Sequence, residues 1–92
     1  MSVYAIHKIL WLTEEDPEFR SRIQANPEEV IKEFPLTREE AQALRDGDIH
    51  ALYQWGVSSF MMRVMPMHNL FGMTAEAYRE RIGNETPRVN LS

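Results

Sequence analysis

Helix-capping signals recur along this sequence at intervals that leave no room for a long helix. A Ser, Thr, Asp or Asn side chain can accept a hydrogen bond from the first free backbone amides of a helix, and a proline fits the first helical position. Five sites carry such a signal: Asp16-Pro17, Asn26-Pro27, Thr37 with Glu40, Asp48 and Thr74. Helices this short bury their apolar faces only by packing against one another, so the signals predict a cluster of short helices.

The first predicted helix runs from about Ser2 to Leu12 and carries two stripes of apolar and aromatic residues. One stripe is aliphatic and consists of Val3, Ile6, Ile9 and Leu10. The adjoining stripe consists of Tyr4, His7 and Trp11. Both stripes follow the spacing of a helix, which fixes the register of this first element.

The later helices are bounded by the capping residues and by proline or glycine. They are expected from Asp16 to Asn26, from Asn26 to Pro35, from Thr37 to Asp46, from Asp48 to Pro66 and from Thr74 to Gly83. Gly56 lies inside the segment that Pro66 closes, and it is expected to mark a helix junction because mid-helix glycine costs about 1 kcal/mol relative to Ala. No segment alternates with period two. The sequence therefore predicts an all-α fold, an irregular compact cluster of six or seven short helices.

The length of 92 residues fits one small domain. We expect residues 1–82 to form a single helical domain and residues 83–92 to form a polar C-terminal tail. A chain of this size buries only about 60 to 65% of its extended surface on folding, so its stability is marginal unless a cross-link or a partner adds to it. Cysteine is absent, which excludes disulfides and thiolate chemistry and suits a reducing cytoplasm. A partner is therefore expected.

The charge balance argues against two classes of partner. Ten Lys and Arg residues against fourteen Asp and Glu residues give a net charge of −4. Neither nucleic acid nor an anionic membrane surface would attract such a chain. The N-terminus lacks the pattern of a signal peptide, and no apolar run is long enough to span a bilayer. These features predict a cytoplasmic protein.

The charges are distributed very unevenly. Seven of the fourteen acidic residues lie between Glu14 and Glu33, whereas the 27 residues from Ile49 to Ala75 contain no acidic residue and one basic residue, Arg63. A solvated helix normally carries a charge every few residues. We expect this acid-free stretch to be mostly buried, either in the core of the domain or against another chain.

The sequence offers little for catalysis or metal binding. His7, His50 and His68 form no pair with the spacing that would place two imidazoles on one helix face. Ser58-Ser59 is not part of a nucleophile motif, and no glycine-rich phosphate loop is present. We therefore expect no catalytic, cofactor-binding or metal-ligating residue in this chain.

A methionine-rich segment from Phe60 to Met73 contains five of the six methionines. Methionine at this density is typical of an adaptable core, but methionine and aromatic residues are also enriched where one protein surface fits another. Arg63 has no acidic neighbour in sequence and needs a carboxylate from elsewhere in the fold, from a partner or from a ligand. On the second interpretation the candidate contact residues are Phe60, Met61, Arg63, His68 and Phe71.

The order of these motifs resembles the small (alpha) subunit family of protocatechuate 4,5-dioxygenase, a class III extradiol ring-cleavage enzyme. The resemblance covers roughly residues 4 to 82. It is carried by Phe19-Arg20, Asn26-Pro27-Glu28, Phe34-Pro35-Leu36-Thr37, Glu39-Glu40, Ala43-Leu44, Gly47-Asp48, Leu52-Tyr53, Gly56, Phe60-Met61 and Gly72-Met73-Thr74 followed by Glu76 and Tyr78. Each motif alone is a common helix start or stop signal, so the specificity of the resemblance lies in the order and spacing of the motifs.

The resemblance implies a non-catalytic role beside a catalytic partner. In that family the large (beta) subunit holds Fe(II) with two histidines and a glutamate and cleaves a catechol-type ring with O2, and the small subunit covers the mouth of that site. Phe60, Met61, Arg63, His68 and Phe71 would then be partner or substrate-mouth contacts, with no iron bound by this chain. The ring substrate and the stoichiometry of the hetero-oligomer stay open.

Two other functions remain as alternatives. One is a stand-alone helical interaction module that uses the same methionine and aromatic surface to form a homodimer or to bind a different protein. The other is a small enzyme in its own right, for which the sequence supplies the least support.

Overall fold

The computed structural model describes residues 3–82, which form α-helices and one 3-10 helix and contain no strand. The elements are α1 (Tyr4–Glu15), α2 (Pro17–Ala25), α3 (Pro27–Ile31), α4 (Arg38–Asp46), α5 (Ile49–Gln54), α6 (Ser59–Met62), α7 (Val64–Met67), η1 (Leu70–Gly72) and α8 (Ala75–Ile82). Only Arg63 separates α6 from α7, and its own backbone is helical, so these two elements form one kinked segment. The predicted all-α cluster of short helices is confirmed.

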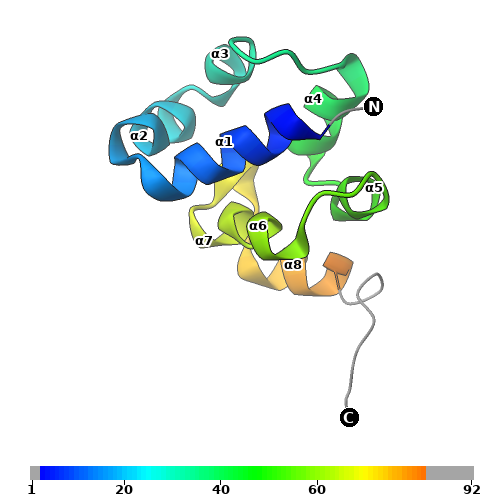
Figure 1. Ribbon diagram of the computed structural model, residues 1–92. Helices are drawn as coiled ribbons and strands as arrows, with labels where there is room; N and C mark the ends of the chain where they lie inside the picture. Colours follow the sequence, from blue (N-terminus) through cyan, green and yellow to red (C-terminus); the bar gives the residue numbers. More distant parts are fainter. Residues whose placement is uncertain (1–2, 83–92) are drawn as a thin grey trace.

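Helix α1 lies at the centre of the arrangement (Figure 1). It packs against α2 at one side and against α6 and α7 below it, while α4 and α5 lie toward its N-terminal end. The last helix, α8, packs against α5 and α7. The predicted tail at 83–92 and the predicted helix stop at Gly83-Asn84 lie outside the described residues.

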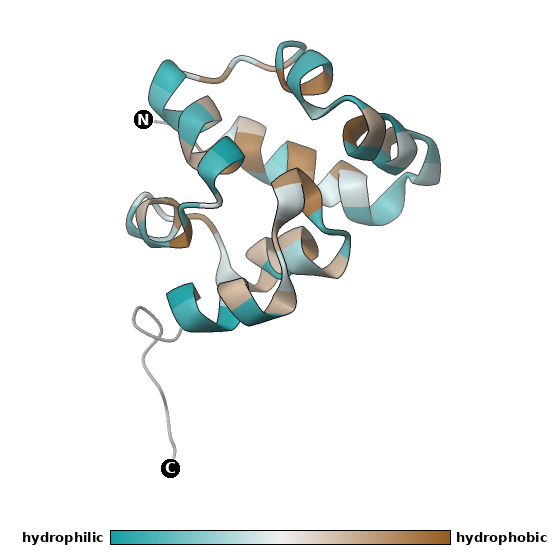
Figure 2. Ribbon diagram, turned by 180° about the vertical axis from the view of Figure 1, so that it is seen from behind, coloured by the Kyte–Doolittle hydropathy of each residue, from teal (hydrophilic) through white to brown (hydrophobic). Residues whose placement is uncertain are grey.

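The core draws apolar residues from nearly every described element. Its fully buried members from α1 are Ile6, Ile9 and Leu10. The other buried apolar side chains of this core are Phe19, Ile23, Val30, Ile31, Ala43, Leu44, Ile49, Leu52, Val57, Met62, Val64, Met65, Leu70 and Met73. Figure 2 shows the hydrophobic parts of the ribbons turned toward the space that the helices enclose.

The acid-free stretch supplies much of this core. Met62, Met65 and Met73 are buried, whereas Met61 is half-buried and Met67 is 50% exposed. The core interpretation therefore holds for three of the five clustered methionines. Of the 27 residues from Ile49 to Ala75, however, only eight are buried and nine are exposed. Burial within this domain therefore explains only part of the missing charge.

The caps form largely as the sequence predicts. The Asp16 carboxylate accepts hydrogen bonds from the amides of Glu18 and Phe19 at 3.0 and 3.3 Å. Thr37 and Glu40 form the complete capping box, with the Glu40 amide donating to the Thr37 hydroxyl at 3.1 Å and the Thr37 amide donating to the Glu40 carboxylate at 2.8 Å. Asp48 and Thr74 cap α5 and α8 through the amides of residues 51 and 77.

Several helix boundaries and caps differ from the sequence-based expectation. Helix α3 ends at Ile31 instead of reaching Pro35. Helix α1 continues to Glu15 instead of ending near Leu12, and Asn26 precedes α3 without a capping hydrogen bond from its side chain. Pro66 lies inside α7, and the helix ends one residue after it, at Met67. Since α7 begins at Val64, Pro66 is in the first turn, where the missing N–H has no helical carbonyl to bind. The junction expected at Gly56 is present, with a φ of 101° between α5 and α6.

Within residues 3–82, no helix combines the length and the apolar character that crossing a bilayer requires.

Candidate functional site

Large apolar side chains are exposed on one side of α1 and on the adjacent α6. Among the described residues, the large apolar side chains that stand out as exposed are Tyr4 at 70%, Phe60 at 65%, Trp11 at 51% and Met67 at 50%. Tyr4 and Trp11 belong to the second stripe of α1, two turns apart on the same face. Solvent-exposed apolar residues gathered in this way are typical of an interaction surface.

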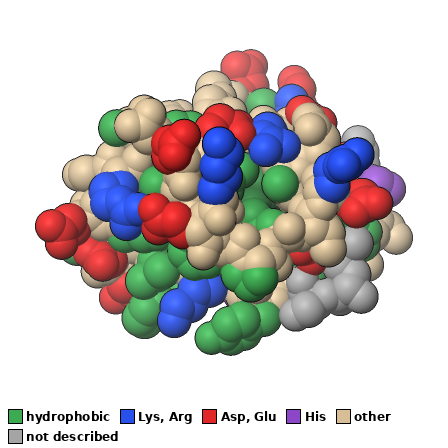
Figure 3. All heavy atoms as spheres, turned by 90° about the horizontal axis from the view of Figure 1, so that it is seen from above, with side chains coloured by type: hydrophobic (Ala, Val, Ile, Leu, Met, Phe, Trp, Pro, Cys, Tyr) green, Lys and Arg blue, Asp and Glu red, His purple; other side chains and the backbone are tan. Residues whose placement is uncertain are grey.

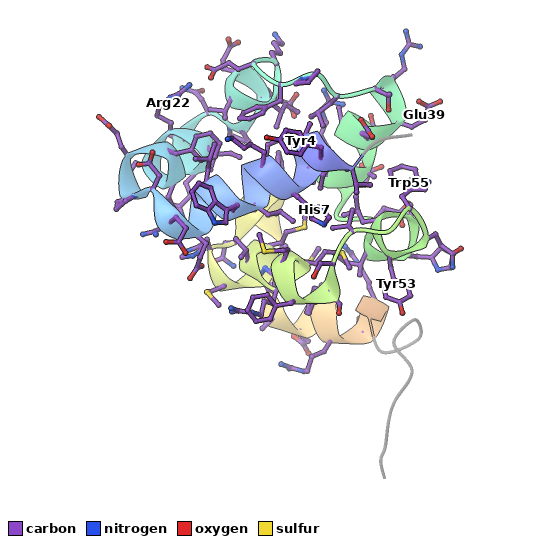
Figure 4. All side chains as sticks on the ribbon, viewed as in Figure 1. Tyr4, His7, Arg22, Glu39, Tyr53 and Trp55 are labelled. Carbon is purple, nitrogen blue, oxygen red and sulfur yellow. The ribbon has the colours of Figure 1, made fainter. Side chains whose placement is uncertain are left out.

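A shallow groove of about 440 Å³ lies between the exposed stripe of α1 and the start of α6. It is lined by Tyr4, His7, Lys8 and Trp11 of α1 and by Met61 of α6. Figure 4 shows Tyr4 on the α1 ribbon and His7 between α1 and α6. Hydrophobic side chains gather along the lower edge of the space-filling view in Figure 3, with basic side chain atoms between them.

His7 fixes the position of α6 relative to α1. Its Nε2 accepts a hydrogen bond from the backbone amide of Ser58 at 3.0 Å, across 51 residues of sequence. The Ser58 hydroxyl in turn caps α6 by accepting from the Met61 amide at 3.3 Å. His7 thus has a structural role in this surface, and the hydrogen bond brings Met61 beside α1.

Phe60 of α6 and Arg63, the residue after α6, pack against each other. The Arg63 guanidinium lies over the Phe60 ring, 4.2 Å from its centroid, which is a close cation–π geometry. Behind them the Tyr78 hydroxyl donates to the carbonyl of Ser59 at 3.2 Å and ties α8 to α6. Burial raises the pKa of Tyr78 above its ordinary value, and the nearby positive charge of Arg63 partly opposes this shift.

His68 has its partners on the first two helices. Its Nε2 is 3.3 Å from a carboxylate oxygen of Glu14, and its backbone carbonyl accepts from the Gln24 amide side chain at 3.0 Å. These contacts connect the end of α7 to the C-terminal part of α1 and to α2. His68 therefore lies near the opposite end of α1 from Tyr4, since α1 rises about 1.5 Å per residue.

Phe71 packs partly against the core in an unusual backbone conformation. Its φ is 53°, and the nearby Asn69 has a φ of 52°. The Asn69 side chain donates to the carbonyl of Met73 at 2.8 Å, which holds this turn together. A phenylalanine in the left-handed region is strained by roughly 1 to 2 kcal/mol, so the surrounding contacts must fix it.

The five predicted contact residues do not lie together in the fold. Met61 lies beside the exposed stripe of α1, and Phe60 and Arg63 pack against each other at α6. His68 contacts α1 and α2, and Phe71 packs on the core.

The sequence-based selection missed Tyr4, Lys8 and Trp11, which line the same groove as Met61. The signal for the two aromatic residues was present in their helical spacing. A second apolar stripe on a helix that already has an aliphatic one indicates a second contact surface.

Potential metal ligands are scattered over the described part of the chain. Between residues 3 and 82, no three His, Asp or Glu side chains come together as a set of ligands. His7 and His68 are engaged with Ser58 and Glu14, near opposite ends of α1.

Comparison with known proteins identifies the family. The sequence model of the family described as the LigA subunit of the aromatic-ring-opening dioxygenase LigAB matches residues 6–82. No curated protein and no solved structure matches the chain. The family match begins two residues inside α1, ends with α8 and covers the lining of the groove except Tyr4. The chain therefore belongs to the LigA subunit family of aromatic-ring-opening dioxygenases.

Proposed function

We propose that this chain is the non-catalytic small subunit of an Fe(II)-dependent extradiol dioxygenase that cleaves catechol-type rings, and that it caps the active site of a large subunit. Membership of the LigA subunit family carries the proposal. The family implies a hetero-oligomer with a large subunit of the LigB type. The exposed apolar surface on α1 and α6 agrees with a chain that works in a complex.

In this proposal the two subunits divide the chemistry. The large subunit holds the iron, and the described part of this chain offers no cluster of ligands for it. The small subunit contributes surface that excludes water from the ring and from bound O2. It also shapes the mouth through which substrate enters, which is a positioning role and involves no proton transfer.

The contacts at the large subunit or at the substrate mouth are assigned to Phe60, Met61, Arg63, His68 and Phe71. Phe60 is well exposed and carries Arg63 on its ring, so this pair can offer a flat apolar face and a positive charge together. A catecholate or a carboxylate on the ring would be attracted by that charge. We place the complex in the cytoplasm. A chain without cysteine has no disulfide that the reducing conditions there would break.

Oxygen consumption on a panel of catechols tests the capping role. A family large subunit from the same organism, loaded with Fe(II), is assayed alone and after addition of this chain. We expect the chain to have no activity by itself and to raise kcat/KM of the large subunit on at least one catechol. If the large subunit has the same rate on every catechol with and without a saturating amount of the chain, the capping role is wrong.

A self-associating interaction module is the alternative function, because an exposed apolar surface can also cover a second copy of itself. Light scattering on the isolated chain separates the two functions. A stable homodimer that takes up no large subunit would favour the alternative.

A further inference from the structure

The fold gives the methionines between Met61 and Met73 very different access to solvent. Met62 and Met65 are completely buried and Met73 is 3% exposed, so these three side chains belong to the core. Met61 is half-buried at the wall of the groove beside α1. Met67 is 50% exposed, more than any other methionine of the described residues. A small oxidant dissolved in the solvent therefore reaches the thioether of Met67 most readily.

The backbone of Met67, and not its side chain, supports the end of α7. Met67 is the last residue of this helix, and its amide donates to the Arg63 carbonyl at 3.2 Å. The contacts that join this end of α7 to α1 and α2 come from the next residue, His68, through its imidazole and its carbonyl. A polar oxygen added to the half-exposed side chain of Met67 can be hydrated, so it carries no burial cost.

The same oxygen would be destabilising on the three core methionines. A sulfoxide is polar, whereas the core cluster that contains Met62, Met65 and Met73 consists of apolar side chains. A polar group buried there without a hydrogen-bond partner would cost free energy. The closed fold also keeps an oxidant away from these sulfur atoms, which it reaches only when the chain opens locally or globally.

We propose that Met67 is a surface oxidation site, at which hydrogen peroxide converts the thioether to methionine sulfoxide while the chain stays folded. A sulfur lone pair attacks one peroxide oxygen, and the O–O bond breaks as the S–O bond forms. The second oxygen takes up the proton of the first and leaves as water, so the sulfur is oxidised and the peroxide is reduced. Methionine sulfoxide reductases can reverse this step. Neither the site nor its reaction depends on the large subunit.

Peptide mapping of the peroxide-treated full chain tests the site. The folded chain is incubated with hydrogen peroxide, quenched at intervals, digested with trypsin and measured by mass spectrometry. Cleavage after Arg63 places Met67 in a peptide with only two other methionines, which fragment spectra resolve. We expect Met67 to gain oxygen at least about tenfold faster than the three core methionines, and faster than Met61. Met1 lies outside the described residues and is followed on its own peptide.

The same treatment in urea is the control for accessibility. The methionines should then be oxidised at similar rates, because no fold protects any of them. If a core methionine of the folded chain is oxidised as fast as Met67, the assignment of the site is wrong.

Two variants test the site and its tolerance of the modification. Met67→Leu removes the thioether and keeps a side chain of similar size, so the fast oxidation of the folded chain should lose its Met67 component. Met61→Leu is the matched control and should keep that component. A short peroxide treatment of the folded wild type should leave the urea midpoint unchanged, whereas a chain oxidised in urea should not recover its native circular dichroism once the urea is removed.

Two results would overturn the proposal. The first is a urea midpoint that falls after the short treatment in the wild type and not in Met67→Leu, since the fold would then not tolerate the sulfoxide. The second is full recovery of the chain oxidised in urea, since the core would then accept sulfoxides as well as the surface does.

Discussion

Replacing His7 with alanine tests how the fold holds α6 against α1. The substitution removes the Nε2 atom that accepts the Ser58 amide at 3.0 Å, 51 residues away in sequence. A hydrogen bond of this kind contributes about 1 kcal/mol net, and loss of the half-buried ring adds a similar amount. We expect a loss of about 1 to 2 kcal/mol in the free energy of unfolding, measured by urea denaturation followed by circular dichroism. In a domain of this size that corresponds to a fall of about 4 to 16 °C in Tm.

Two further variants make this prediction specific. His7→Gln keeps an acceptor at nearly the position of Nε2 and should recover part of the loss. Lys8→Ala changes the next residue of the same helix, which is exposed, and should stay within about 0.5 kcal/mol of the wild type. If His7→Ala is as stable as Lys8→Ala, the long-range hydrogen bond does not hold the two helices together and the reasoning fails.

Three other predictions follow from local features of the fold. Thr37→Ala removes the cap of α4 and should lower the free energy of unfolding, measured by urea denaturation, by about 1 kcal/mol. An unchanged free energy of unfolding would contradict the role of the cap. Gly47→Ala should cost at least about 1 kcal/mol, because φ is 62° there and the new Cβ would lie 2.5 Å from the Met73 side chain; an unchanged Tm would contradict this. Because burial raises the pKa of Tyr78, its contribution to stability is present below the ordinary value of 10.0 and is lost as pH rises through the higher pKa of the folded state. Unfolding measured against alkaline pH should show this loss in the wild type and not in Tyr78→Phe, which has no hydroxyl to donate to the Ser59 carbonyl.

The helix boundaries that local chemistry determines could be read from the sequence. Asp16 and the Thr37–Glu40 pair cap their helices as predicted, because a cap depends on atoms within three or four residues. The helix stop predicted at Pro66 falls one residue before the end of α7 at Met67. The start of α7 at Val64 was not predicted, because no capping side chain marks it.

The candidate surface was predicted in part. The acid-free stretch indicated buried residues, but nothing in it distinguished Met62, which is in the core, from Met61, which faces the groove. The hydrogen bond between His7 and Ser58 joins residues that are far apart in sequence, so only the folded arrangement reveals it. Spacing along α1 did encode the exposed aromatic stripe, because helical periodicity alone places Tyr4 and Trp11 on one face.

The mass of a mixture of this chain with its large subunit tests the central claim most directly. The two purified proteins are mixed, separated by size exclusion and measured by multi-angle light scattering. We expect a single stoichiometric complex whose mass is the sum of both chains, in whole-number multiples, with the 10.8 kDa chain depleted from its own position. If the chain elutes at its own mass beside an unchanged large subunit, it is not a subunit of such an enzyme.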